Sequence, residues 1–166
     1  MKNPILLFLL GVPLLAACVF DVPFTTDHVI SIDQSILGAW ESVPAENDDP
    51  VQTRIFRYSD TEYLVHYLED DWDIYFRAYP INLGGVSAIQ LEVLGDKDEA
   101  VEQDAAERYM IATYRLLDNK LEVRTLNSDL VSPDIKDSEL LRAAFLKHKE
   151  NPELFNDPGF FRRSEN

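Results

Sequence analysis

The sequence predicts a mainly β domain: an antiparallel up-and-down meander, closed into a barrel or a strongly curled sheet, with one C-terminal α-helix. Three observations predict this fold. From residue 36 onward, short runs of β-forming residues alternate with turn signals. Several runs carry apolar residues at every second position, as a sheet curled around a core requires. After Pro133, the spacing of apolar residues changes to that of a helix.

Seven β-type runs with short connections are typical of an antiparallel meander. They cover residues 36–41, 53–58, 62–68, 72–79, 86–94, 109–117 and 120–126. Asp118-Asn119 joins the last two. Because Asp and Asn tolerate the positive φ of a two-residue hairpin turn, this hairpin is the best defined. Pro80 and Gly84-Gly85 indicate the connection between the fourth and fifth runs.

A helix is predicted over about residues 138–149, with Asp137 or Ser138 as its N-cap. Asn151-Pro152 ends it. Such a helix is well placed to close a barrel end or to cover a sheet edge. Its predicted apolar face comprises Leu140, Leu141, Ala144, Phe145 and His148.

The N-terminal segment is typical of an export signal. Lys2 is followed by an uncharged run from residue 5 to 17, which is too short to span a bilayer comfortably. The run ends in small residues directly before Cys18, the only cysteine of the chain. A plain secretory signal, or an uncleaved anchor with a bystander cysteine, is the alternative interpretation.

Leu15-Ala16-Ala17-Cys18 resembles the lipobox of bacterial lipoproteins. The resemblance implies cleavage after Ala17, diacylglycerol on the Cys18 sulfur and acylation of the new amine, which together anchor the chain in a membrane. Residues 1–17 are then the signal peptide, 18–35 a lipidated tether and 36–166 one domain. Val19 follows the cysteine where Asp would favour inner-membrane retention. The resemblance therefore implies the outer membrane, with the domain facing the periplasm.

Composition excludes some partners. The net charge is −15 and the signal contributes one lysine and no acid, so the mature chain is still more acidic. Nucleic acid is therefore excluded as a partner, because phosphate binding needs a basic surface. With Cys18 used for lipid, the domain has no disulfide, and its length is sufficient for a core without one.

Gly38-Ala39-Trp40 on the first run is similar to the Gly-x-Trp motif of lipocalins, in which the Trp packs at the closed end of the barrel. The meander and the C-terminal helix also fit a lipocalin-like pattern over residues 36–150. The resemblance implies a barrel that binds a small molecule in its interior. The chain departs from the family in having seven predicted strands instead of eight.

Tyr75, Arg77 and Tyr79 share one face of the fourth run, and together with His66 they are the candidate ligand-binding residues. An arginine among tyrosines suits an anionic or amphiphilic ligand. The alternative is that the rings fill a core and Arg77 caps it. If this face lines a cavity, Arg77 needs a carboxylate partner or an anionic ligand; if it faces outward, Ile74 and Phe76 line the pocket.

No catalytic, metal or cofactor site is predicted. His66 lies mid-strand with no identifiable partner, and a histidine with one hydrogen bond in the core or at the rim is its simplest interpretation. The chain lacks HxxxH ligand spacing, a Gly-x-Ser-x-Gly motif and a phosphate loop. Clusters of acids such as Glu69-Asp70-Asp71 fit solvated hairpin tips better than calcium loops.

Two functions remain open at this stage. One is a membrane-anchored, non-catalytic binding module for a small apolar or amphiphilic ligand. The other is a structural or interaction lipoprotein that docks to an envelope protein complex. A hollow barrel interior favours the first function, whereas a packed interior with an exposed apolar patch favours the second.

Overall fold

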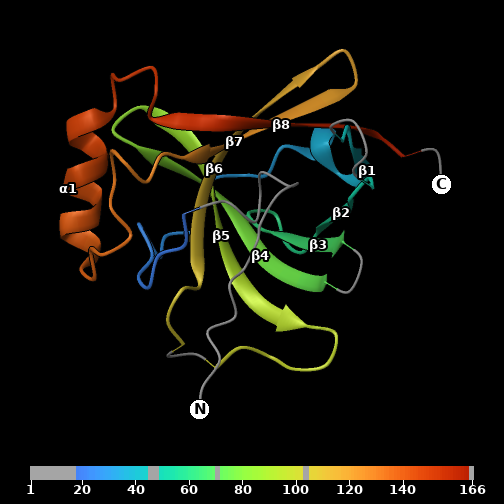
Figure 1. Ribbon diagram of the computed structural model, residues 1–166, viewed down its shortest axis with the longest axis horizontal. Coiled ribbons are helices and arrows are strands. Elements are labelled where there is room, and N and C mark those ends of the chain that lie inside the picture. The colour runs from blue at the N-terminus through green and yellow to red at the C-terminus, as the bar shows by residue number, and fades with distance from the viewer. Residues whose placement is uncertain (1–17, 45–48, 70–71, 103–104, 165–166) are drawn as a thin grey trace.

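The computed structural model describes residues 18–44, 49–69, 72–102 and 105–164, which form a closed antiparallel barrel with one helix outside it (Figure 1). The predicted fold class is confirmed, while the predicted signal peptide lies outside the described residues. Eight strands follow one another in chain order: β1 Gly38–Ser42, β2 Gln52–Arg57, β3 Tyr63–Glu69, β4 Trp72–Leu83, β5 Val86–Asp96, β6 Tyr109–Leu117, β7 Lys120–Leu126 and β8 Phe155–Arg163. A 3₁₀ turn, η1 (Gln34–Ile36), precedes β1, and the helix α1 (Ser138–His148) precedes β8.

The expectation of seven strands was wrong, because β8 closes the barrel by pairing with both β1 and β7. Residues 156–159, Asn-Asp-Pro-Gly, lie inside this strand and are typical of a turn. Asp157 has a positive φ of 49°. The ladder between β7 and β8 shifts register between Val123 and Thr125, so the turn-like residues are accommodated as an irregularity within a continuous strand.

β4 also runs farther than predicted, past Pro80 to Leu83. β3 begins with Tyr63 opposite Ala78, so Pro80 lies beyond the last pair with β3 and is paired with Ile89 of β5. Since β3 has ended there, the missing N–H of proline breaks no bond of the β3–β4 ladder.

Two local predictions are confirmed. Asp118 and Asn119 have φ values of 48° and 64° in the β6–β7 turn, as a two-residue hairpin of the predicted kind requires. Asp137 is the N-cap of α1, and its carboxylate accepts hydrogen bonds from the backbone N–H groups of Glu139 and Leu140, both at 2.9 Å.

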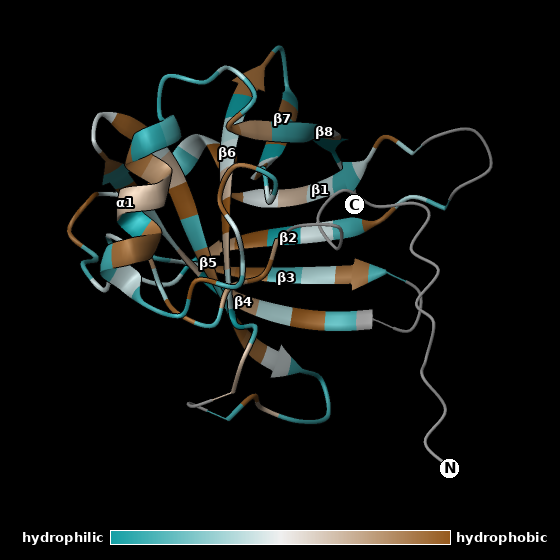
Figure 2. Cartoon of the chain, turned by 60° about the vertical axis from the view of Figure 1, so that its left-hand side comes forward, coloured by the Kyte–Doolittle hydropathy of each residue, from teal (hydrophilic) through white to brown (hydrophobic). Residues whose placement is uncertain are grey.

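Apolar side chains form two cores, one on each face of the barrel wall. Figure 2 shows the corresponding alternation of hydrophobic and hydrophilic residues along the strands. β4 contributes Phe76 and Ala78 to the inner core, and Tyr79 and Ile81 to the outer core. Both faces of this strand therefore carry large buried side chains.

The helix α1 covers part of the outer core. Leu141 and Phe145 are fully buried there, together with Ile81 and Leu83 of β4. Leu140, which was expected on the apolar face, is 64% exposed. The buried stripe of the helix is thus narrower than the sequence pattern indicated, because only one side of α1 meets the barrel wall.

Residues 18–35 were expected as a tether, but their first part, residues 18–24, lies against the outside of the barrel. Phe20 and Tyr109 exchange two backbone hydrogen bonds, of 2.8 and 3.0 Å. Phe20 and Phe24 are fully buried, with their rings edge to face at 5.2 Å. Burial of two aromatic rings holds this segment on the domain.

Candidate functional site

An apolar cavity of about 80 Å³ lies inside the barrel, and all eight strands contribute to its wall. Ala78 of β4 and Ala112 of β6 face it, and their small side chains leave the space open. The wall is completed by Ile36, Trp40, Thr53, Ile55, Tyr63, Val65, Ile89, Leu91, Thr113, Tyr114, Leu121, Val123 and Phe161. Apart from this cavity, large buried rings such as Tyr67 and Phe76 fill the interior.

One residue of the cavity wall, Thr53, has a buried polar group without a partner among the described residues. Its side chain is on β2, opposite Trp40 of β1 and Tyr67 of β3, and the residue is only 7% exposed. The hydroxyl oxygen is buried and has no hydrogen-bond partner among the described residues. A buried hydroxyl without a partner is destabilising. The surface of the cavity is entirely apolar, so this hydroxyl is buried behind the wall and is not exposed to the cavity.

Residues just before β1 close one end of the barrel. Tyr63 of β3 donates to the carbonyl of Asp33 at 3.2 Å and accepts from its N–H at 2.7 Å. Tyr114 of β6 donates to the Asp33 carboxylate at 3.2 Å. Burial raises the pKa of both tyrosines, so both phenols remain neutral hydrogen-bond donors at physiological pH. Ile36 then extends into the cavity wall.

The predicted ligand residues of β4 lie outside this cavity. Phe76 and Ala78 point into the barrel, so Tyr75, Arg77 and Tyr79 are on the outer face. Of the two orientations that the sequence left open, the structure has the outward one. Ala78, rather than Ile74 or Phe76, is the β4 residue that lines the cavity.

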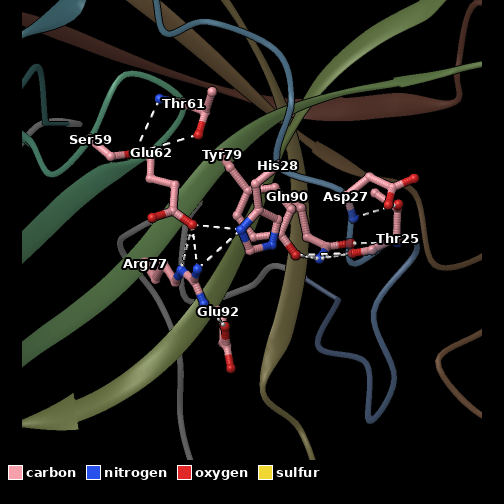
Figure 3. A network of polar contacts seen from close by, with 10 residues as sticks. All are labelled: Thr25, Asp27, His28, Ser59, Thr61, Glu62, Arg77, Tyr79, Gln90 and Glu92. Carbon is pink, nitrogen blue, oxygen red and sulfur yellow. Dashed lines mark hydrogen bonds and ion pairs between the residues drawn. The ribbon is translucent and has the colours of Figure 1, made fainter.

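Arg77, whose side chain is 37% exposed, pairs with a buried carboxylate, that of Glu62 (Figure 3). Its Nε donates to Glu62 at 2.9 Å, and Nη2 contacts the same oxygen. The Glu62 side chain is 8% exposed, and its Oε1 lies 2.5 Å from Nδ1 of His28 in the N-terminal segment. Glu92 lies 4.0 Å away on the other side. Arg77 therefore belongs to an internal ion-pair network that joins residue 28 to the barrel wall.

Tyr79 is held in the same network. Its hydroxyl donates to the carbonyl of Thr25 at 3.0 Å and contacts the amide of Gln90. Burial, with the nearby charge of Glu92, raises the pKa of Tyr79 to about 12. Because its neutral phenol hydrogen-bonds both Thr25 and Gln90, Tyr79 attaches the N-terminal segment to the barrel.

His66 lies on the outer face of β3, where its Nε2 is 2.5 Å from the carboxylate of Asp73. Its ring stacks on Tyr75 with centroids 4.3 Å apart and an interplanar angle of 4°. Among its contacts with described residues there is no serine, threonine or cysteine. The carboxylate orients the imidazole, but the arrangement does not provide a nucleophile for it to activate.

Cys18 is a half-buried free thiol at the start of the described chain. Burial, with a smaller effect of the Asp134 charge, raises the pKa of this thiol to about 11. The thiol is therefore protonated at neutral pH and is not an activated nucleophile in the fold. Within the described ranges, no three or more His, Cys, Asp or Glu side chains group together as metal ligands.

Comparisons with known proteins found no matching family model, no matching curated protein and no matching solved structure. Across the part of the chain that the structure describes, no helix combines the length and the apolar character needed to cross a bilayer.

Sequence reasoning missed Thr53, Glu62 and Gln90. Thr53 left a weak signal, because it alternates with Ile55 on a strand whose other positions are Gln52, Arg54 and Phe56. A threonine that alternates in step with an inward aliphatic residue is a candidate for a buried, inward-facing side chain. Glu62 and Gln90 left none, since their side-chain partners lie at least 11 residues away in sequence.

Proposed function

We propose that this protein is a lipid-anchored, non-catalytic binding domain that takes a small, mostly apolar molecule into its barrel. The observation that supports this most is the apolar cavity inside the barrel, to which all eight strands contribute. Binding sites for small molecules are typically apolar with a few placed polar groups. Because the surface of this cavity is apolar, the ligand class is a small apolar molecule.

The volume of the cavity limits the size of this ligand. A cavity of about 150 Å³ lined by apolar side chains is enough to bind benzene. The cavity here measures about 80 Å³, about half of that volume, so it suits a molecule smaller than benzene. A ligand with one aromatic ring enters only if the wall shifts outward. A fatty acid of ordinary length does not fit inside, which narrows the amphiphilic ligand expected from the sequence.

The membrane anchor is the second part of the proposal. It rests on Leu15-Ala16-Ala17-Cys18 after an uncharged run, and the compartment implied by the lipobox resemblance is the periplasmic face of the outer membrane. The eight-stranded up-and-down barrel, with Trp40 buried near η1, supports the lipocalin-like part of the resemblance. In such barrels the interior is the natural ligand site.

The test uses the chain from residue 18 with Cys18→Ser, titrated with phenol and with benzene by calorimetry. Saturable binding of benzene is expected, and phenol should bind more weakly because the apolar wall offers its hydroxyl no partner. Thr53→Val keeps the shape of the side chain and removes a hydroxyl that is not exposed to the cavity, so it should leave the binding of both probes unchanged. Thr26→Val is the matched control, because Thr26 is exposed.

Filling the cavity provides the decisive comparison. Ala112→Leu places a larger side chain in the cavity and should abolish binding of both probes; Ala78→Val is the milder alternative if the first variant does not fold. Thr53→Val should also leave stability unchanged or raise it slightly, because it removes an unpaired buried hydroxyl. Equal binding by the filled and unfilled barrels would refute an interior site.

A further inference from the structure

A second hollow, of about 510 Å³, lies on the outside of the barrel wall. Its sides come from β5, β6 and β7, the C-terminal end of α1 and the start of β8. We call it the outer groove. Its volume falls within the range of about 300–1,000 Å³ typical of small-molecule sites. It is distinct from the apolar cavity, although Thr113 and Tyr114 of β6 border both.

The charge of the outer groove is opposite to that of the chain. The chain has 30 acidic and 15 basic residues, yet the groove is lined by three cations, Arg115, Arg124 and Lys149, and by one acid, Glu122. Cations gathered in a hollow of an acidic protein provide a local attraction for an anion.

Glu122 holds the two arginines in place without using all their donors. Its side chain is 8% exposed and accepts from Arg115 Nη2 at 3.1 Å and from Arg124 Nε at 2.5 Å. These two cations keep the pKa of Glu122 below its usual range, so Glu122 stays ionised. Each guanidinium has five N–H donors, and the remaining ones are left for solvent or a ligand.

Lys149 supplies the third cation from the C-cap of α1. Its ammonium donates to the carbonyl of Gly84 at 3.2 Å. Glu150 lies 3.7 Å away, but its side chain is 88% exposed, so this pair is largely screened by solvent. The ammonium is therefore positioned by backbone while most of its charge remains available.

The rest of the groove is partly apolar. Leu154 and Phe155, which lead into β8, line it together with Val86 of β5 and Pro152. Leu154 is 2% exposed, so this part of the lining is firmly packed. Cations beside a packed apolar surface match a molecule with an anionic head and an apolar body.

We propose that the outer groove binds an anionic amphiphile, a carboxylate or phosphate head with a short hydrocarbon body. The head lies among Arg115, Arg124 and Lys149, and the body lies on Val86, Pro152 and Phe155. This site is independent of the interior site proposed above. The same chemistry is found in free fatty acids and in the headgroup region of anionic lipids.

The test compares decanoate with decanol, which share a chain but differ in charge, by calorimetry on the chain from residue 18 with Cys18→Ser. Decanoate should bind at least about tenfold more tightly, because charge-assisted bonds to its head are lost in the alcohol. Lys149→Gln and Arg124→Gln should each weaken decanoate severalfold. Lys147→Gln, an exposed lysine on the same helix that does not line the groove, is the matched control.

Two further comparisons distinguish the outer groove from the interior cavity, and a free amphiphile from a membrane lipid as the ligand. Ala112→Leu fills the interior cavity and should leave decanoate binding intact. Sedimentation with phosphatidylglycerol vesicles, compared with phosphatidylcholine vesicles, shows whether the groove also binds a lipid headgroup. If the protein binds phosphatidylglycerol vesicles and Lys149→Gln abolishes this binding, the ligand of the groove is a membrane lipid. If the protein binds decanoate but not the vesicles, the ligand is a free amphiphile. Equal affinity for decanoate and decanol, or equal loss in Lys147→Gln, would refute the proposal.

Discussion

Trp40 shows how one side chain closes an end of the barrel. It is 1% exposed, and its indole N–H donates to the carbonyl of Ile36 in η1 at 2.8 Å. The guanidinium of Arg163, from the far end of β8, lies over the ring at 4.2 Å from its centroid. Arg163 also donates to the carbonyls of Leu37 and Ser35. The indole therefore links the first strand, the turn before it and the last strand.

Removing this ring should be among the most destabilising single changes in the chain. We expect Trp40→Ala to lower the free energy of unfolding by about 3–5 kcal/mol, because it leaves a large cavity and removes a cation–π contact. Urea unfolding measures the loss. Phe160→Ala is the control, since Phe160 is 44% exposed and should change stability by less than about 1 kcal/mol. An unchanged midpoint for Trp40→Ala would mean that the ring does not contribute to closing the barrel.

At the scale of elements, the N-terminal segment is attached by a side chain that replaces a strand partner. The Gln90 side chain on β5 is fully buried. Its carbonyl oxygen accepts from the N–H groups of Phe24 at 2.7 Å and Thr25 at 3.3 Å, and its amide donates to the carbonyl of Thr25 at 3.0 Å. Three bonds to the backbone resemble one rung of a β-ladder.

Gln90→Leu should detach this segment while leaving the barrel closed. The substitution keeps the size of the side chain but leaves two backbone N–H groups without their partner, which costs about 1–3 kcal/mol. Hydrogen exchange should show loss of protection at residues 24 and 25, with the amides of β3 and β4 unaffected. Gln52→Leu, at an exposed position of β2, should have neither effect. Retained protection in Gln90→Leu would show that Phe20 and Phe24 suffice to hold the segment.

At the scale of the whole molecule, the docked segment sets the distance between barrel and anchor. Phe20 is already paired with Tyr109, and two residues of chain span at most about 7 Å. If Cys18 carries lipid, the barrel lies directly at the bilayer surface instead of at the end of a flexible tether. The acidic composition then limits adhesion of the rest of the domain to anionic lipid.

Expression of the full chain in a bacterium with the lipoprotein pathway tests the proposed anchor. The protein should appear in the membrane fraction, and mass spectrometry should find acyl groups on an N-terminal Cys18, because more than one chain is needed for stable anchoring. Cys18→Ser should release the protein from membranes. Lys2→Gln serves as the control that alters the signal without removing the thiol. A soluble mature protein that begins at another residue would contradict the proposal.

Local features were predictable because their causes are local. The strand alternation, the Asp118-Asn119 turn and the Asp137 cap depend on residues that are neighbours in sequence. The predicted bounds of β6 and β7 agree with the structure for the same reason. β8 escaped prediction because Asp157 and its neighbours have turn-like preferences, which pairing with β1 and β7 overrides.

The candidate sites were harder to predict than the fold. The sequence by itself determined a meander of alternating strands, a helix after it and a lone cysteine behind an apolar run. Only the tertiary structure decided that Arg77 faces outward to Glu62, that the Thr53 hydroxyl is buried without a partner, and that Phe20 and Phe24 pack on the barrel. The physical reason is that alternation places two residue sets on opposite faces but does not say which is inside, and burial and ion pairing join residues far apart in the chain.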